Sequence, residues 1–126
     1  MERAIWFSRH TPVPKQVDVL KQKGIEIVAY IPGVRDAEEA LYLIKSNNAK
    51  YVIPVLPLSI IVKLLELAKT NNFIILYAEM EKVHNIGPCP PNCPFDPLTD
   101  TIDKGRHFRF KQFKILKDIQ FVFEDF

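Results

Sequence analysis

Apolar residues along this chain fall into short blocks whose internal spacing changes in a regular way. Four blocks are almost continuously apolar and cover residues 4–7, 25–31, 51–56 and 73–78. Such blocks are typical of strands that are covered on both faces. The segments between them place apolar residues three or four positions apart, which predicts amphipathic helices. The alternation therefore predicts three strand-helix steps that lead into a fourth strand, which is the pattern of an α/β protein.

The first two predicted helices carry capping signals. Pro14 suits the first turn of a helix, and Gly24 suits the position just beyond its last turn. Asp36 and Glu39 form a capping-box pattern at the start of the second helix. The third helix, expected over residues 59–70, is so rich in leucine and isoleucine that we expect a second apolar face on it, suited to a neighbouring subunit.

The regular pattern stops after residue 81. Residues 84–105 contain five prolines and predict a long loop, and loops of that length are uncommon unless they are functional or disordered. Residues 106–126 alternate again and predict a C-terminal β-hairpin with its turn near Lys117 and Asp118. The phase of the alternation changes near Lys111 and Gln112, which predicts either a β-bulge or a break there; a short helix over residues 113–116 is a further alternative.

The order of elements predicts a small doubly wound, mainly parallel, Rossmann-like sheet with strand order 2-1-3-4, because crossovers in parallel sheets are right-handed. Ligands of such sheets bind beyond the carboxyl ends of the strands where the strand order reverses, here strands one and three. The first of these ends carries Ser8, Arg9, His10 and Thr11, and the second leads to Ser59.

Length and composition fit one domain over residues 1–126. The chain is 48% hydrophobic, enough for one sizeable core. Its formal net charge of +2 is too small for a general nucleic-acid coat, so we expect no long nucleic acid as partner. The first ten residues do not have the pattern of a signal peptide, and no run approaches the roughly 20 apolar residues of a membrane span. We therefore expect a soluble cytoplasmic protein without a membrane partner.

The polar cluster after the first strand suits a phosphate. Neither G-x-G-x-x-G nor G-K-[ST] is present, which disfavours a dinucleotide cofactor and a P-loop. Arg9 offers a planar donor pair for phosphate oxygens, and the amides of the following helix start beside Thr11. His10 is a candidate acid or base. The structural alternatives are that Ser8 satisfies backbone groups and that His10 caps the helix.

A second basic segment lies near the C-terminus, where aromatic residues are interleaved with cations. Such a segment can hold phosphates by charge and bases by stacking. A half-buried strand with a basic outer face for solubility is the alternative. The cations are Lys104, Arg106, Arg109, Lys111, Lys114 and Lys117.

Two cysteines lie in the proline-rich segment. Cys89 and Cys93, with His84 and His107, are residue types that bind zinc, although the spacing matches no standard zinc motif. A disulfide and two unpaired thiols are the other interpretations. No function is assigned to them, and no cofactor is expected.

Three short motifs together resemble the small stand-alone CRISPR-associated Rossmann-like proteins of type III systems, relatives of CARF domains. They are Ser-Arg-His after the first strand, Tyr-Ala-Glu-Met-Glu at residues 77–81 and Gly-Arg-His-Phe-Arg-Phe at residues 105–110. The resemblance implies a homodimer that binds cyclic oligoadenylate, in particular cyclic tetra-adenylate. It further implies metal-independent ring cleavage by a ribose 2'-hydroxyl, which would switch off type III antiviral signalling. The segment with the two cysteines departs from the family's pattern.

The resemblance also implies residue roles. Arg9 would contact the scissile phosphate and His10 would act as acid or base, with His107 as a further catalytic residue brought to the same rim. Glu79 would orient a ribose or a histidine. The expected ligand-binding residues are Ser8, Thr11, Ser59, Glu79, Arg106 and Arg109.

Two other function classes stay open. The same contacts would serve a protein that binds the cyclic nucleotide without cutting it. Residues 7–10 also resemble the strand-end Arg-His of histidine phosphatases, in which the imidazole accepts a phosphoryl group. Against this, Thr11 stands where those enzymes usually have glycine, and the chain is short for their fold.

Overall fold

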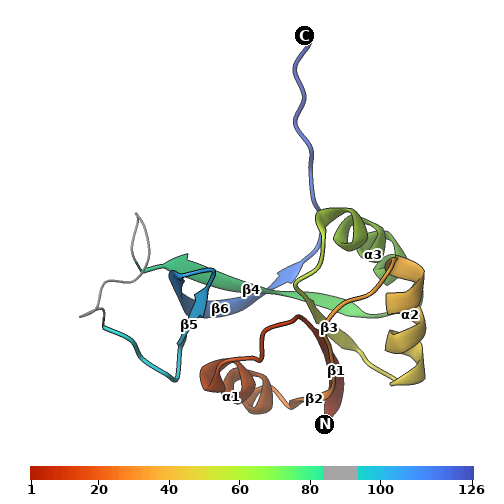
Figure 1. Ribbon diagram of the computed structural model, residues 1–126. Coiled ribbons are helices and arrows are strands. Elements are labelled where there is room, and N and C mark those ends of the chain that lie inside the picture. Colours follow the sequence, from red (N-terminus) through yellow and green to blue (C-terminus); the bar gives the residue numbers. More distant parts are fainter. Residues whose placement is uncertain (84–93) are drawn as a thin grey trace.

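The computed structural model describes residues 1–83 and 94–126, and in them three helices and one six-stranded mixed sheet (Figure 1). The elements are β1 (Glu2–Phe7), α1 (Pro14–Gln22), β2 (Ile25–Ile31), α2 (Ala37–Ser46), β3 (Tyr51–Pro54), α3 (Leu58–Asn71), β4 (Ile74–Lys82), β5 (Asp100–Asp103) and β6 (Arg106–Leu116). The predicted α/β class is therefore confirmed.

The sheet has the order β2-β1-β3-β4-β6-β5. The pairs β1-β2, β1-β3 and β3-β4 are parallel, so the first four strands follow the predicted order 2-1-3-4. β6 pairs antiparallel with β4, and β5 pairs antiparallel with β6. The sheet is therefore mixed, because two strands from the last third of the chain extend it at the β4 edge.

The C-terminal hairpin exists, but its predicted position was wrong. It is formed by β5 and β6 around a two-residue turn, and residues 117–126 form no strand. Lys104 and Gly105 have φ values of 52° and 76°, the left-handed conformations that a tight hairpin turn requires. β5 therefore lies within residues 84–105, which the sequence pattern assigned to a loop.

Of the two predicted irregularities near Lys111 and Gln112, the structure has the bulge. Glu79 pairs with Gln112 and Met80 pairs with Phe110, so Lys111 has no counterpart on β4. The alternative of a helix over residues 113–116 is wrong, because β6 continues through them to Leu116.

The capping signals are borne out where the structure tests them. The Asp36 carboxylate accepts a hydrogen bond of 2.8 Å from the backbone N–H of Glu39 at the start of α2. Gly24 follows α1 with a φ of 74°, a conformation that costs glycine little. The third strand is shorter than predicted, since it ends at Pro54 instead of residue 56.

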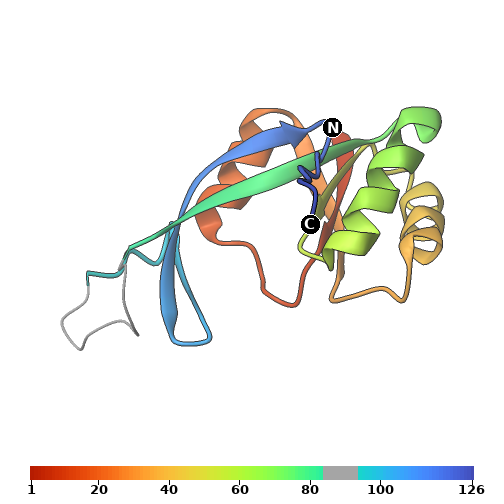
Figure 2. The ribbon, with the colours of Figure 1, turned by 90° about the horizontal axis from the view of Figure 1, so that it is seen from above.

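Helices lie on both faces of the sheet (Figure 2), and each face carries a cluster of buried apolar residues. On one face, Trp6 of β1 belongs to a cluster with Leu20 of α1. On the other, Phe7 belongs to a cluster with Ile44 of α2 and Leu64 of α3. Neighbouring residues of β1 thus point to opposite layers, which explains why the strand is continuously apolar and buried from Ala4 to Phe7.

The last ten residues, 117–126, leave the body of the molecule as an extended segment (Figure 1). Ile119 still packs on the α2 and α3 side of the core, whereas most of the residues beyond it are exposed. No helix within the described residues is both long and apolar enough to span a bilayer.

Candidate functional site

A cavity of about 380 Å³ opens at the carboxyl ends of β1 and β3. Its wall includes Trp6, so we call it the Trp6 cavity. Most of its other lining side chains are apolar, among them Ile61, Met80 and Phe108. The polar lining residues are Ser8, His10, Thr11, Gln16, Thr101 and Asp103. The position beside the strand-order reversal is the one predicted from the sequence.

The chain that leaves β1 is held by hydrogen bonds at each step. The backbone N–H of Ser8 donates to the carbonyl of Ile31 at 3.0 Å, and the Ser8 hydroxyl accepts from the backbone N–H of His10 at 3.1 Å. The indole N–H of Trp6 donates to the carbonyl of His10 at 2.7 Å. Ser8 therefore serves the backbone, as its structural interpretation held, and it also lines the cavity.

His10 lies at the mouth of the Trp6 cavity and faces an acid from the hairpin. Its Nε2 is 3.4 Å from Oδ1 of Asp103, and the two side chains are 53% and 43% exposed. His10 does not cap α1, because Val13 occupies the N-cap position. Asp103 was missed by the sequence analysis because it lies in the segment interpreted as a loop, and the Lys-Gly pair that follows it is not one of the strong hairpin-turn signals.

Arg9 belongs to a second cavity. This Arg9 cavity, of about 360 Å³, is lined by the loops after β1, β2 and β3 and shares Ser8 and His10 with the Trp6 cavity. Pro32 and Gly33 are on its far wall. Ser8 and His10 thus border both cavities, at a common rim, whereas Arg9 lines only the Arg9 cavity.

The expected anion site at the start of α1 is wrong. Pro14 has no N–H, the N–H of Lys15 donates to the carbonyl of Leu98 at 2.9 Å, and the N–H of Gln16 donates to the carbonyl of Val13 at 3.0 Å. Because these amides are absent or already bonded, a phosphate at this edge would have to be held by side chains.

Gln16 is a cavity residue that the sequence analysis missed. It is only 4% exposed, although it is polar, and it lines the Trp6 cavity. Its Oε1 accepts from the backbone N–H of Val13 at 2.8 Å, and its Nε2 lies 3.7 Å from Sδ of Met80. The sequence signal was weak, because one glutamine three residues after Val13 is an ordinary feature of an amphipathic helix.

The structure does not bring His107 and Arg109 together with His10. Thr101 and Phe108 are paired across the hairpin and line the Trp6 cavity. Because side chains alternate along a strand, the neighbouring residues His107 and Arg109 point to the opposite face of the hairpin. Their expected place on the common rim was therefore wrong.

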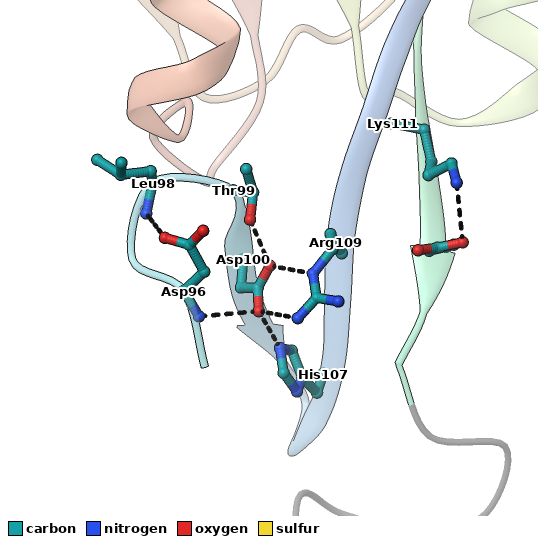
Figure 3. A network of polar contacts seen from close by, with 8 residues as sticks. Asp96, Leu98, Thr99, Asp100, His107, Arg109 and Lys111 are labelled. Atoms are coloured by element: carbon teal, nitrogen blue, oxygen red, sulfur yellow. Dashed lines mark hydrogen bonds and ion pairs between the residues drawn. The ribbon is translucent and has the colours of Figure 1, made fainter. Parts of the chain in front are cut away.

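On that opposite face, His107 and Arg109 hold a buried carboxylate (Figure 3). His107 Nε2 is 2.6 Å from Oδ2 of Asp100, and the Arg109 guanidinium donates to both carboxylate oxygens at 2.8 and 2.9 Å. Thr99 and the backbone N–H of Asp96 add further hydrogen bonds. The Arg109 hydrogen bonds hold the pKa of Asp100 well below its usual range.

The other expected ligand-binding residues are more dispersed. Glu79 is bonded to Lys114 at 2.9 Å and to Gln112 at 3.1 Å, and the bond from Lys114 lowers the pKa of Glu79. Ser59 is exposed in the first turn of α3. Arg106 is exposed and pairs in register with Asp103, which puts it on the cavity side of the hairpin.

The candidate metal ligands His84, Cys89 and Cys93 lie outside the described residues. Within residues 1–83 and 94–126, no group of three His, Cys, Asp or Glu side chains is arranged to hold a metal ion.

The fold and the cavity together define an α/β protein with a ligand-sized site at the carboxyl edge of its sheet. Comparison with protein-family models, with curated proteins and with solved structures finds no match to this chain.

Proposed function

We propose that this protein binds cyclic oligoadenylate, in the form of cyclic tetra-adenylate, across a homodimer interface and cleaves it without a metal ion. In this role it would switch off type III CRISPR signalling. The observation that carries the proposal is the Trp6 cavity, whose interior is apolar and aromatic and whose mouth carries His10 and Thr11 beside Arg9. This combination suits a flat base inside and a phosphate at the mouth.

The geometry of the mouth supports a cleavage role for His10. Asp103, 3.4 Å from Nε2, can hold the imidazole in one orientation. In the proposed step a ribose 2'-oxygen attacks the adjacent phosphorus, the bond from phosphorus to the 5'-oxygen breaks, and a 2',3'-cyclic phosphate is left. The 2'-hydroxyl loses its proton and the leaving 5'-oxygen gains one; His10 acts as the base or the acid in this exchange, and Arg9 stabilises the charge on the phosphoryl oxygens.

The size of the cavity supports a symmetric dimer. About 380 Å³ is near the lower end of the range for small-molecule sites and suits part of a four-nucleotide ring. A two-fold symmetric ring is matched by two such cavities related by a two-fold axis. In the absence of one copy, the site would hold only part of the ligand.

The test is incubation of the protein with labelled cyclic tetra-adenylate in EDTA, with retention followed on native gels and products on denaturing gels. We expect linear products ending in 2',3'-cyclic phosphate, and a rate about 10² to 10⁴-fold lower for His10→Ala. Lys69→Ala, an exposed change in the last turn of α3, is the control and should cleave normally.

Other results would contradict the proposal in different ways. Retention without products in wild type would leave a binding protein and remove the cleavage step. If wild type neither retains nor cleaves the ring, the proposal is overturned. Phosphohistidine at His10 after incubation with a phosphate ester would instead favour the phosphatase interpretation.

A further inference from the structure

Gln16 is the least exposed polar residue that lines the Trp6 cavity. The residue is 4% exposed and belongs to α1, whereas the nearest hydrogen-bonding partner of its nitrogen, Met80, belongs to β4. The carboxamide therefore lies between the helix and the sheet, at the cavity wall.

The orientation of this carboxamide is fixed by the helix start. The backbone N–H of Val13 is a donor, so the Gln16 atom 2.8 Å from it must be the oxygen. The amino end is thereby directed toward Met80 and the cavity. A flip of the amide would place two donors against each other and lose the cap.

The amino group of Gln16 has only a weak hydrogen-bond acceptor. It has two hydrogens, and the acceptor assigned to it is a thioether sulfur at 3.7 Å, which is a weak acceptor. A buried donor without a good acceptor is costly, and a ligand that supplies one gains the difference. The Gln16 amino group is thus a donor that a ligand acceptor in the cavity would satisfy better than Met80 does.

The surroundings restrict what can supply that lone pair. Trp6 and Phe108 give flat apolar surface, and the indole of Trp6 is held in place by its bond to the His10 carbonyl. Among the described residues that line this cavity there is no lysine or arginine, and Asp103 at the mouth is acidic. An anionic group is therefore disfavoured in the interior, and an uncharged planar group with an in-plane acceptor is favoured.

We propose that Gln16 is a specificity-determining residue that donates a hydrogen bond to a ring nitrogen of a nucleobase held in the Trp6 cavity. This inference rests on the proposed function, in which the base is adenine. It divides the ligand between two parts of the site, with the base against Gln16 and the phosphate at His10 and Arg9.

The test uses a substitution that keeps the length of the side chain, removes its donor and adds a negative charge. Gln16→Glu keeps an oxygen to accept from Val13 N–H but replaces the amino group with an acceptor. Gln22→Glu makes the same chemical change at an exposed position of α1 and is the matched control. Calorimetric titration with cyclic tetra-adenylate is expected to show at least about tenfold weaker binding for Gln16→Glu and an unchanged affinity for Gln22→Glu.

A second measurement leaves the protein unchanged and removes the acceptor from the ligand. Rings built from 1-deaza, 3-deaza or 7-deaza adenosine replace one ring nitrogen by a C–H group. We expect one of the three to bind wild type about tenfold more weakly, and Gln16→Glu to treat that ring like the parent. The comparison of the three deaza rings with the parent ring on wild type can be made even if Gln16→Glu fails to fold.

The outcomes separate the two proposals. In one outcome, wild type binds the parent ring, while neither Gln16→Glu nor any of the three deaza rings lowers the affinity. That result would overturn the role of Gln16 and leave the proposed function standing. An absence of binding by wild type would overturn both.

Discussion

Asp100 shows how one residue can organise a hairpin. Its carboxylate is buried and accepts from Arg109, His107, Thr99 and the backbone of Asp96. A buried charge is expensive unless such bonds replace its water, and removal of one partner leaves the others uncompensated. The network belongs to the fold, on the face of the hairpin away from the cavity.

We predict that Asp100→Asn lowers the free energy of unfolding by about 3 kcal/mol at neutral pH. The effect should fade in acid. Because the pKa of Asp100 is lowered in the folded state, its contribution is full above the unfolded-state pKa, about 3.9, and is lost as the pH falls below it.

Urea unfolding of wild type and Asp100→Asn, at about pH 7 and about pH 3, measures both effects. Asp18→Asn, an exposed change on α1, is the control. A stability difference that stays the same at the two pH values would contradict the role given to the Asp100 charge.

The sequence predicted the site at the residue scale only in part. Ser8 and His10 could be placed because a strand end beside the order reversal is a topological position. His107 could not, because alternation tells which residues share a face but not which face borders the cavity. Its partner Asp100 also lies in a segment with no periodic signal of its own.

At the scale of elements, the hairpin of β5 and β6 adds cavity-lining residues to those that the parallel part of the sheet and its loops provide. It brings Thr101, Asp103 and Phe108 to the Trp6 cavity. The parallel core was predictable, since its strands are apolar on both faces and its helices carry caps. β5 was not, because a four-residue strand with two aspartates has little apolar pattern.

We predict that Gly105→Ala destabilises the protein by about 1 kcal/mol, since Gly105 has a φ of 76° and a side chain there is strained. Thermal unfolding measures the loss, and amide exchange should locate it in β5 and β6. Gly33→Ala is the control, because Gly33 has no strained φ and an added Cβ meets no atom within 4 Å. Equal stabilities of the two variants would refute the assignment of the turn.

At the scale of the whole molecule, the C-terminal segment is the feature that a single copy leaves unexplained. Phe121, Val122, Phe123 and Phe126 are exposed, Phe123 by 87%. Exposed apolar groups gathered on one segment commonly mark an interaction surface. We propose that this segment packs on a second copy and contributes to the homodimer of the proposed function.

We predict that the full chain is a dimer and that removal of residues 120–126, which retains Ile119 in its core contact, converts this proposed dimer to a monomer. Light scattering coupled to size-exclusion chromatography measures the mass of both forms. The rate of cyclic tetra-adenylate cleavage should fall when the dimer is lost, because each separate copy would hold only part of the ring. A truncated protein that remains dimeric would show that another surface forms the interface.

The bond from the Trp6 indole to the His10 carbonyl has a practical consequence. Trp6 is the only tryptophan of the chain, and it forms a wall of the cavity. The emission of an indole depends on the polarity around it and on any ring stacked against it. Ligand binding at the candidate site can therefore be followed in unlabelled protein by the emission wavelength and intensity of Trp6 fluorescence.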